Sequence, residues 1–125
     1  MTMLVLVVED DPLISLDLCS IAQEAGCVTV AAPTVSSARN AAAEYPFDLA
    51  IIDLKLGPGT NGADLARELL GQYGLPSLIV SGHLTDAVRS DLLDTAVFAI
   101  AKPYEPQAVR AAIFAALEPR NELLA

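Results

Sequence analysis

The chain has 125 residues, 54% of them hydrophobic and 18% charged, a length typical of one domain with its own core. Sixteen acidic residues against seven basic ones give a net charge of −9, which argues against a nucleic-acid partner because phosphate binding requires clustered lysine and arginine. The longest apolar run, Met3–Val8, is far shorter than the roughly 20 residues of a membrane span, so we expect no membrane association and a cytoplasmic location.

Five short apolar runs predict the strands of a parallel sheet. The runs are continuous rather than alternating, which is typical of strands buried on both faces. They span Leu4–Val8, Val28–Ala32, Leu49–Ile52, Leu78–Val80 and Val97–Ala101.

The stretches between and after these runs show the 3.6-residue period of helices. Start and stop residues mark their ends, as with Pro12 and Gly26 around the first helix. The second is expected from a cap at Thr34 or Ser36 to about Glu44, the third with Ala66, Leu69, Leu70 and Tyr73 on its apolar face before Gly74, the fourth from about Thr85 to Asp94, and the fifth through Val109 to Leu117. The alternation predicts one α/β domain over residues 1–125, with its core between about residues 4 and 117 and helices on both sheet faces.

Polar groups follow four of the predicted strands. They are Glu9, Asp10 and Asp11 after the first strand, Asp53 after the third, Ser81 after the fourth and Lys102 after the fifth. Ligands of open parallel sheets bind beyond the carboxyl ends of the strands. Converging carboxylates repel one another unless a cation lies among them, and carboxylates with phosphate oxygens suit Mg²⁺. With Lys102 and Ser81 beside them, these acids predict a phosphoryl-transfer site with a carboxylate nucleophile.

Four motifs in this order, LVLVVEDD, LAIIDL, LIVSG and AIAKPY, resemble the receiver domain of two-component response regulators, the CheY-like family. The resemblance covers Leu4 to about Leu117. It implies a flavodoxin-like (βα)₅ sandwich with strand order 2-1-3-4-5. It also implies phosphoryl transfer from a phosphohistidine, switching a face that binds a downstream protein. The donor would be a histidine kinase or a histidine phosphotransfer protein of a phosphorelay. Such a domain modifies itself and turns over no external substrate, so we do not expect an enzyme, and we expect a monomer or weak dimer.

The resemblance also implies roles for individual residues. Asp53 would be the phosphoacceptor, and Ser81 and Lys102 would hold the phosphoryl group. Mg²⁺ would be bound by Asp10, Asp53 and the Lys55 backbone carbonyl, with Glu9 acting through water, and the Lys102–Pro103 bond would be cis.

Two departures from the family pattern concern the loop after Asp53 and the fifth strand. In the segment LKLGPGTNG, Pro58 and Gly62 fall one position later than in most receivers. Ala99 stands where receivers usually carry the aromatic residue that rotates on activation. Together with SGHLT, these features are similar to an atypical alphaproteobacterial subgroup of single-domain receivers. The switch is then expected at Ser81, Gly82 and His83, with Tyr104 as a second candidate.

Other interpretations of these residues stay open. Asp11 is expected to cap the first helix, and His83 is expected to be a loop residue. An aspartyl phosphatase of the haloacid-dehalogenase type would need a second Asp where Lys55 stands, and a flavin phosphate would be repelled by Glu9–Asp11. The remaining alternative is a receiver-like scaffold for protein interactions that works without phosphorylation.

Overall fold

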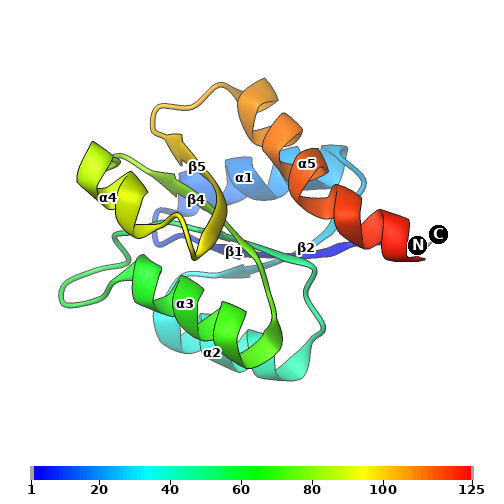
Figure 1. Ribbon diagram of the computed structural model, residues 1–125, viewed down its shortest axis with the longest axis horizontal. Helices are drawn as coiled ribbons and strands as arrows, with labels where there is room; N and C mark the ends of the chain where they lie inside the picture. Colours follow the sequence, from blue (N-terminus) through cyan, green and yellow to red (C-terminus); the bar gives the residue numbers. More distant parts are fainter. Residues whose placement is uncertain (1, 125) are drawn as a thin grey trace.

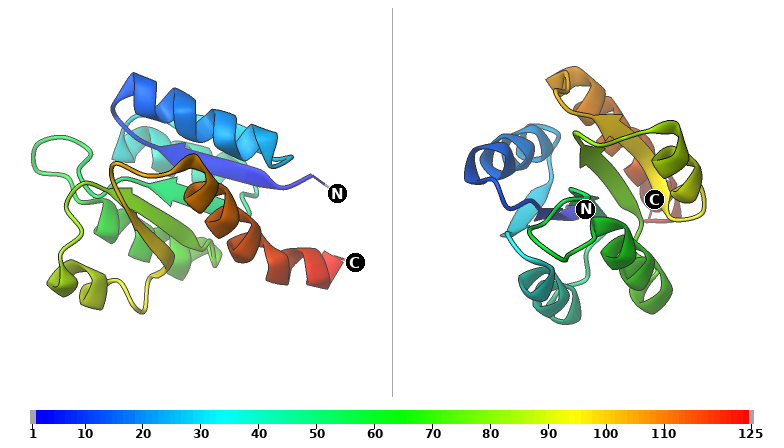
Figure 2. Two further views of the ribbon diagram at one scale, coloured as in Figure 1. Left: turned by 90° about the horizontal axis from the view of Figure 1, so that it is seen from above. Right: turned by 90° about the vertical axis from the view of Figure 1, so that its left-hand side faces the viewer.

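The computed structural model describes residues 2–124 and shows one parallel sheet between two layers of helices (Figures 1 and 2). The strand order is β2-β1-β3-β4-β5, with every neighbouring pair parallel, as predicted. The strands are β1 (Leu4–Val8), β2 (Val28–Ala32), β3 (Leu49–Ile52), β4 (Ser77–Ser81) and β5 (Ala96–Ala101). The helices are α1 (Pro12–Glu24), α2 (Val35–Glu44), α3 (Gly62–Tyr73), α4 (Asp86–Asp91) and α5 (Pro106–Leu124). In the view of Figure 1, α1 and α5 lie above the sheet and α2 and α3 below it.

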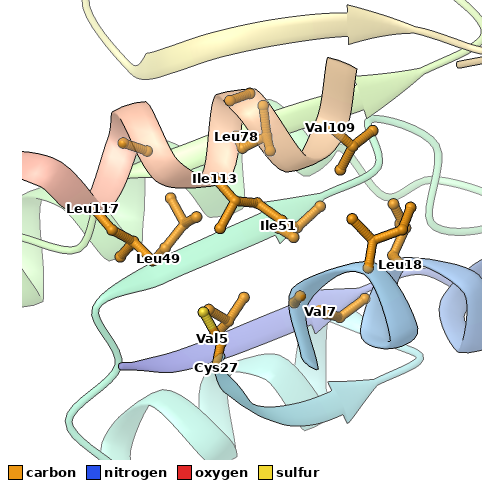
Figure 3. Packing of buried hydrophobic residues seen from close by; sticks show 14 of the residues in the cluster. Val5, Val7, Leu18, Cys27, Leu49, Ile51, Leu78, Val109, Ile113 and Leu117 are labelled. Atoms are coloured by element: carbon orange, nitrogen blue, oxygen red, sulfur yellow. The ribbon is translucent and has the colours of Figure 1, made fainter. Parts of the chain in front are cut away.

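Both faces of the sheet are buried, and its central strands β1 and β3 are apolar at every position. In β1, Val5 and Val7 pack with α1 and α5, whereas Leu6 and Val8 belong to the cluster on the other face. Figure 3 shows the first cluster, in which Ile113 of α5 lies over the strands. This two-sided burial explains the continuous apolar runs in the sequence.

Local signals in the sequence set the ends of most helices. The Asp11 side chain accepts hydrogen bonds from the backbone N–H groups of Leu13 and Ile14, which confirms it as the N-cap of α1. Thr34, rather than Ser36, caps α2. Gly74 ends α3 in the left-handed region at φ 63°, where glycine is favoured. None of the described helices has the length and hydropathy needed to cross a bilayer.

The fourth helix is shorter than predicted and ends at Asp91 instead of Asp94. Beyond it the backbone turns so that Leu92 is buried, and the N–H groups of Thr95 and Ala96 both donate to the Leu92 carbonyl. The apolar face predicted for α3 is also only partly correct. Of the predicted residues, Ala66 and Leu69 are buried, whereas Leu70 is 37% and Tyr73 43% exposed. Leu65, which was not predicted, is buried with them.

Candidate functional site

The pairing of β1 with β3 brings the predicted acidic residues to one edge of the sheet. Val8 and Ile52 are partners in the register, so the residues that follow them leave the sheet side by side. These residues are Glu9 and Asp53, and the Asp53 N–H donates to the Val8 carbonyl at 3.0 Å. The carboxyl edge of the sheet is therefore where the acidic side chains meet, as the strand order predicts.

Three carboxylates form a compact cluster at this edge. Glu9, Asp10 and Asp53 each place one carboxylate oxygen within 4.8 Å of the others. Glu9 is 2% exposed and Asp53 8%, whereas Asp10 is exposed. The cluster thus combines two buried acids with one that faces solvent, which places strong negative charge at an accessible point.

Lys102 supplies the positive charge of the site. Its Nζ donates to Glu9 Oε1 at 2.6 Å and to Asp53 Oδ2 at 3.1 Å. Burial alone would lower the pKa of Lys102, but these two carboxylates raise it. Burial raises the pKa of Glu9 and outweighs the opposing hydrogen bonds from Lys102 and the Asp11 N–H. The folded protein therefore holds a carboxylate whose ionisation carries a cost, beside a lysine that stays charged.

The donor set suits a hard divalent cation. Carboxylate oxygens at this spacing are the ligands that Mg²⁺ takes in proteins, together with waters and phosphate oxygens. Asp53 Oδ1 accepts a hydrogen bond from the Lys55 N–H at 3.3 Å, so the chain after Asp53 folds back toward the cluster. The Lys55 carbonyl as a ligand stays a prediction.

Ser81 is the last residue of β4, the strand beside β3, and it is fully buried. The Ser81 carbonyl accepts a hydrogen bond from the backbone N–H of Lys102 at 2.9 Å, so the two residues lie side by side. Its hydroxyl accepts from the His83 N–H at 3.2 Å. The structure thus brings Ser81 beside Lys102 and places His83 in the loop after β4, as expected, while a phosphate contact of Ser81 stays a prediction.

Gly62 explains how the longer loop after Asp53 still closes. The Gly62 N–H donates to the Leu54 carbonyl at 2.9 Å, and a Cβ at this position would overlap the Asp53 carbonyl oxygen. Glycine is required because α3 begins against the backbone of the candidate acceptor, not because of an unusual φ. The turn before Gly62, in which Gly57 and Gly59 both have positive φ, accommodates the one additional residue of this loop.

Two contacts near the site have no signal in the sequence. Arg89 of α4 donates from Nη1 to the Ala99 carbonyl at 3.1 Å, beside the position without an aromatic side chain. The Tyr104 hydroxyl donates to the Asp17 carboxylate of α1, and burial together with this acid raises the Tyr104 pKa. Both pairs join residues that only the fold brings together, so no spacing rule finds them. The Lys102–Pro103 bond between them is cis, as the resemblance implied.

Comparisons with known proteins agree with this geometry. The family model described as the response regulator receiver domain matches residues 5–114. The chain is 38% identical over 118 residues to the two-component response regulator PhoP of Pseudomonas aeruginosa, covering 92% of this chain and 52% of PhoP. It is 29% identical over 115 residues to the phyllosphere-induced regulator PhyR of Methylorubrum extorquens, covering 90% of this chain and 43% of PhyR. The chain thus spans about half the length of the curated relatives that it matches.

A solved structure shows the same fold. The response regulator receiver domain protein (CheY-like) from Methanospirillum hungatei superposes with a TM-score of 0.88 and is 23% identical. The match covers 98% of both chains.

Proposed function

Because the chain belongs to the response regulator receiver domain family, we propose that it accepts a phosphoryl group on Asp53 in a two-component system or phosphorelay. The donor would be the phosphohistidine of a histidine kinase or of a histidine phosphotransfer protein. The observation that supports this proposal is the cluster of Glu9, Asp10 and Asp53 with Lys102 bonded to two of them.

In this proposal each residue of the cluster has a chemical role. A bond forms between an Asp53 oxygen and phosphorus while the N–P bond of the donor breaks, and the imidazole nitrogen leaves with the electron pair and takes up a proton. Mg²⁺ held by Asp10, Asp53 and the Lys55 carbonyl, with Glu9 through water, would neutralise charge on the phosphoryl oxygens. Lys102 would exchange its 3.1 Å bond to Asp53 for one to a phosphoryl oxygen, and Ser81 would donate its hydroxyl to another.

A phosphorylation assay tests the acceptor. Incubation with a small phosphodonor and Mg²⁺ is expected to add one phosphoryl group, measured by intact mass, and Asp53→Asn is expected to abolish this gain. Asp64→Asn is a matched control, because it removes the same charge from an exposed acid of α3. Labelling of Asp53→Asn at the wild-type level would show that Asp53 is not the acceptor. A wild-type chain that no small donor or phosphohistidine protein labels would favour the alternative, a scaffold that works without phosphorylation.

Magnesium is expected to stabilise the fold, because it would bind the native cluster and not the unfolded chain. At a Mg²⁺ concentration tenfold above its Kd the gain is about 1.4 kcal/mol, or roughly 5 °C in Tm for a domain of this size. Asp10→Asn is expected to reduce the shift, measured by thermal unfolding at constant ionic strength. Asp11→Asn changes the charge equally but keeps a helix-capping residue, so its shift should match that of the wild type. A Tm that does not change with Mg²⁺ concentration would contradict the metal site.

We also propose that phosphorylation acts through the segment from Ser81 to α4, with Tyr104 as a second candidate, because Ala99 has no side chain that can rotate. Rotation of Ser81 toward a phosphoryl oxygen would break its 3.2 Å bond from the His83 N–H and release the loop. Gly82 does not have a positive φ, and no atom lies within 4 Å of a Cβ built there. Neither backbone strain nor crowding therefore requires glycine at this position in this structure. α4 itself buries no side chain, so little packing opposes its movement.

Backbone amide NMR with and without beryllofluoride, a phosphoryl mimic, checks this switch. Shifts are expected to run from Ser81 through α4. Gly82→Pro is expected to reduce them while Asp53 can still be modified, and Gly82→Ala is the matched control because the structure has room for its methyl group. Shifts confined to the neighbours of Asp53 would contradict the proposal.

We further propose that residues 1–125 act as one cytoplasmic receiver domain of the atypical alphaproteobacterial single-domain subgroup, as a monomer or weak dimer. The support is the longer loop after Asp53, the SGHLT segment and Ala99. No activity toward an external substrate is proposed.

A further inference from the structure

A cavity of about 450 Å³ lies beside the lysine of the proposed site, between α1 and the segment that joins β5 to α5. It is lined by Ile14 and Asp17 of α1 and by Lys102, Pro103 and Tyr104. The charged groups of this lining are one carboxylate, that of Asp17, and the ammonium group of Lys102. Lys102 therefore borders both the acidic cluster and an open space that contains a further acid.

The direction in which Lys102 points is not fixed by packing. Its Nζ donates to Glu9 Oε1 at 2.6 Å and to Asp53 Oδ2 at 3.1 Å, but its flexible four-carbon stem lies against the cavity. Burial disfavours the charged form of Lys102, so an orientation toward the open space would regain hydration. The attraction of Glu9 and Asp53 therefore has to outweigh that of any free carboxylate across the cavity.

The Asp17 carboxylate already has a partner. It accepts a hydrogen bond from the Tyr104 hydroxyl. Among the side chains that the structure describes, no lysine or arginine forms an ion pair with Asp17. Burial and, after it, this carboxylate raise the pKa of Tyr104, so its hydroxyl stays protonated and remains a donor at neutral pH. The hydrogen bond thus keeps Asp17 engaged on the far side of the cavity.

The Tyr104 hydroxyl lies within electrostatic reach of the acidic cluster. The charge of Glu9 adds to the rise in the Tyr104 pKa, and Glu9 is the residue that Lys102 contacts most closely. The ring of Tyr104 packs against the core cluster on the α1 and α5 face of the sheet. Packing places the ring, and the hydroxyl adds only the bond to Asp17, so the two contributions can be separated by mutation.

We propose that Tyr104 is a positioning residue for phosphoryl transfer. Its hydroxyl occupies the Asp17 carboxylate, so that Lys102 stays with Glu9 and Asp53 instead of turning through the cavity toward Asp17. The inference rests on the proposed function, since Lys102 is needed in place only when Asp53 accepts a phosphoryl group. Tyr104 touches no reacting atom, and this role precedes phosphorylation, which distinguishes it from the switch considered above.

The rate of phosphorylation by phosphoramidate with Mg²⁺, followed by intact mass, tests the proposal. In this reaction an Asp53 oxygen bonds to phosphorus while the P–N bond breaks and ammonia leaves with the electron pair. Tyr104→Phe is expected to slow the reaction about tenfold, because the freed Asp17 draws Lys102 away. Tyr104→Phe/Asp17→Asn is expected to return to within about twofold of the wild-type rate, because a neutral amide does not attract the lysine.

Three single variants serve as references. Asp17→Asn is expected to match the wild type, since asparagine still accepts from the tyrosine hydroxyl without carrying a charge. Tyr45→Phe removes the hydroxyl of a tyrosine that is 47% exposed and outside this cavity, and it is expected to leave the rate unchanged. Lys102→Met gives the rate of a site without its lysine, and Tyr104→Phe is expected to fall between that rate and the wild type.

NMR of the lysine side chains reports the position of Lys102 without any phosphodonor. The chain has two lysines, Lys55 and Lys102, so labelled lysine gives two signals, and Lys102→Met identifies one of them. The Lys102 signal is expected to move in Tyr104→Phe and to return in the double variant. A chain that no donor labels would contradict the proposed function alone, because these signals still show whether Tyr104 keeps Lys102 at the cluster.

A Lys102 signal that is the same in Tyr104→Phe and the wild type would overturn the inference. So would a slow Tyr104→Phe that Asp17→Asn does not rescue, because the hydroxyl would then act through the fold and not through Asp17. An Asp17→Asn variant as slow as Tyr104→Phe would also overturn it, since the charge of Asp17 would then assist the reaction instead of competing for Lys102.

Discussion

Gly62→Ala is expected to destabilise the protein by about 3 kcal/mol, lowering its Tm by roughly 10 °C. A methyl group at residue 62 would overlap the Asp53 carbonyl oxygen and lie 2.9 Å from the Asp53 carbonyl carbon and from Leu54 Cα. All three are backbone atoms, so no side-chain rotation relieves the overlap. The start of α3 or the strand end that carries Asp53 must move instead.

Gly71→Ala is the matched control within the same helix. No atom lies within 4 Å of a Cβ built at Gly71, which is exposed in the interior of α3. Alanine there is expected to stabilise the protein by about 0.5–1 kcal/mol, because glycine is the weaker helix former. Chemical unfolding of both variants would show opposite signs. Equal stabilities for the two variants would contradict the close approach between α3 and the backbone of Asp53.

Lys102→Met is expected to destabilise the metal-free protein by about 3 kcal/mol at neutral pH. The variant keeps an apolar side chain of similar length but leaves Glu9 and Asp53 together without their shared cation. An unpaired buried charge is costly, so the loss exceeds that of an exposed ion pair. Adding Mg²⁺ is expected to recover part of the loss, because a divalent cation would again neutralise the two acids.

The pH dependence of this loss follows from the pKa of Glu9. Burial raises this pKa above the ordinary value of 4.5, so the folded protein binds the proton more tightly than the unfolded chain does. Stability associated with Glu9 is therefore fully present below pH 4.5 and is lost as the pH rises through the folded pKa. Removal of Lys102 takes away a hydrogen bond that lowers this pKa, so the loss extends to higher pH. The wild type and Lys102→Met are expected to differ least near pH 4.

The ionisation of Lys102 affects the stability of the protein in the alkaline range. Its raised pKa means that its pairing stabilises the protein below its ordinary value of 10.5, and that this contribution is lost as the pH rises through the folded pKa. Urea unfolding between pH 4 and pH 9 compares Lys102→Met with the wild type over the range in which the raised pKa of Glu9 affects stability. The double variant Glu9→Gln/Lys102→Met is expected to recover most of the stability, because it no longer buries the glutamate charge. A loss that is independent of pH, and equal in the single and double variants, would contradict the charge argument.

The sequence by itself determined the sheet and the residues at its carboxyl edge. Three strands have the predicted bounds to the residue, because runs such as Leu49–Ile52 are apolar at every position and stop at a charged residue. The strand order came from the resemblance, and it is confirmed. The convergence of Glu9, Asp10 and Asp53 needed only the rule that parallel strands end at the same edge. The signals for these strands and for the acids that follow them lie in consecutive residues, so they can be recognised without knowledge of the fold.

The helices were predicted less completely where tertiary contacts compete with local preference. Nothing local ends α4 at Asp91; burial of Leu92 does so, by drawing the chain into a turn. Tyr73 fits the apolar period of α3 but remains 43% exposed, because it lies at the end of the helix beyond the sheet that covers Leu65 and Leu69.

Only the tertiary structure decided which side chains meet across long separations. The sequence placed Lys102 near the acids, but the particular oxygens that it contacts were decided by the folded chain. The hydrogen bonds from Tyr104 to Asp17 and from Arg89 to Ala99 likewise depend on distances that no spacing in the sequence encodes. Gly62 is the clearest example of what the sequence alone does not explain. Its place in the motif was visible in the sequence, but the reason for glycine is the backbone of Asp53, which only the folded chain places against it.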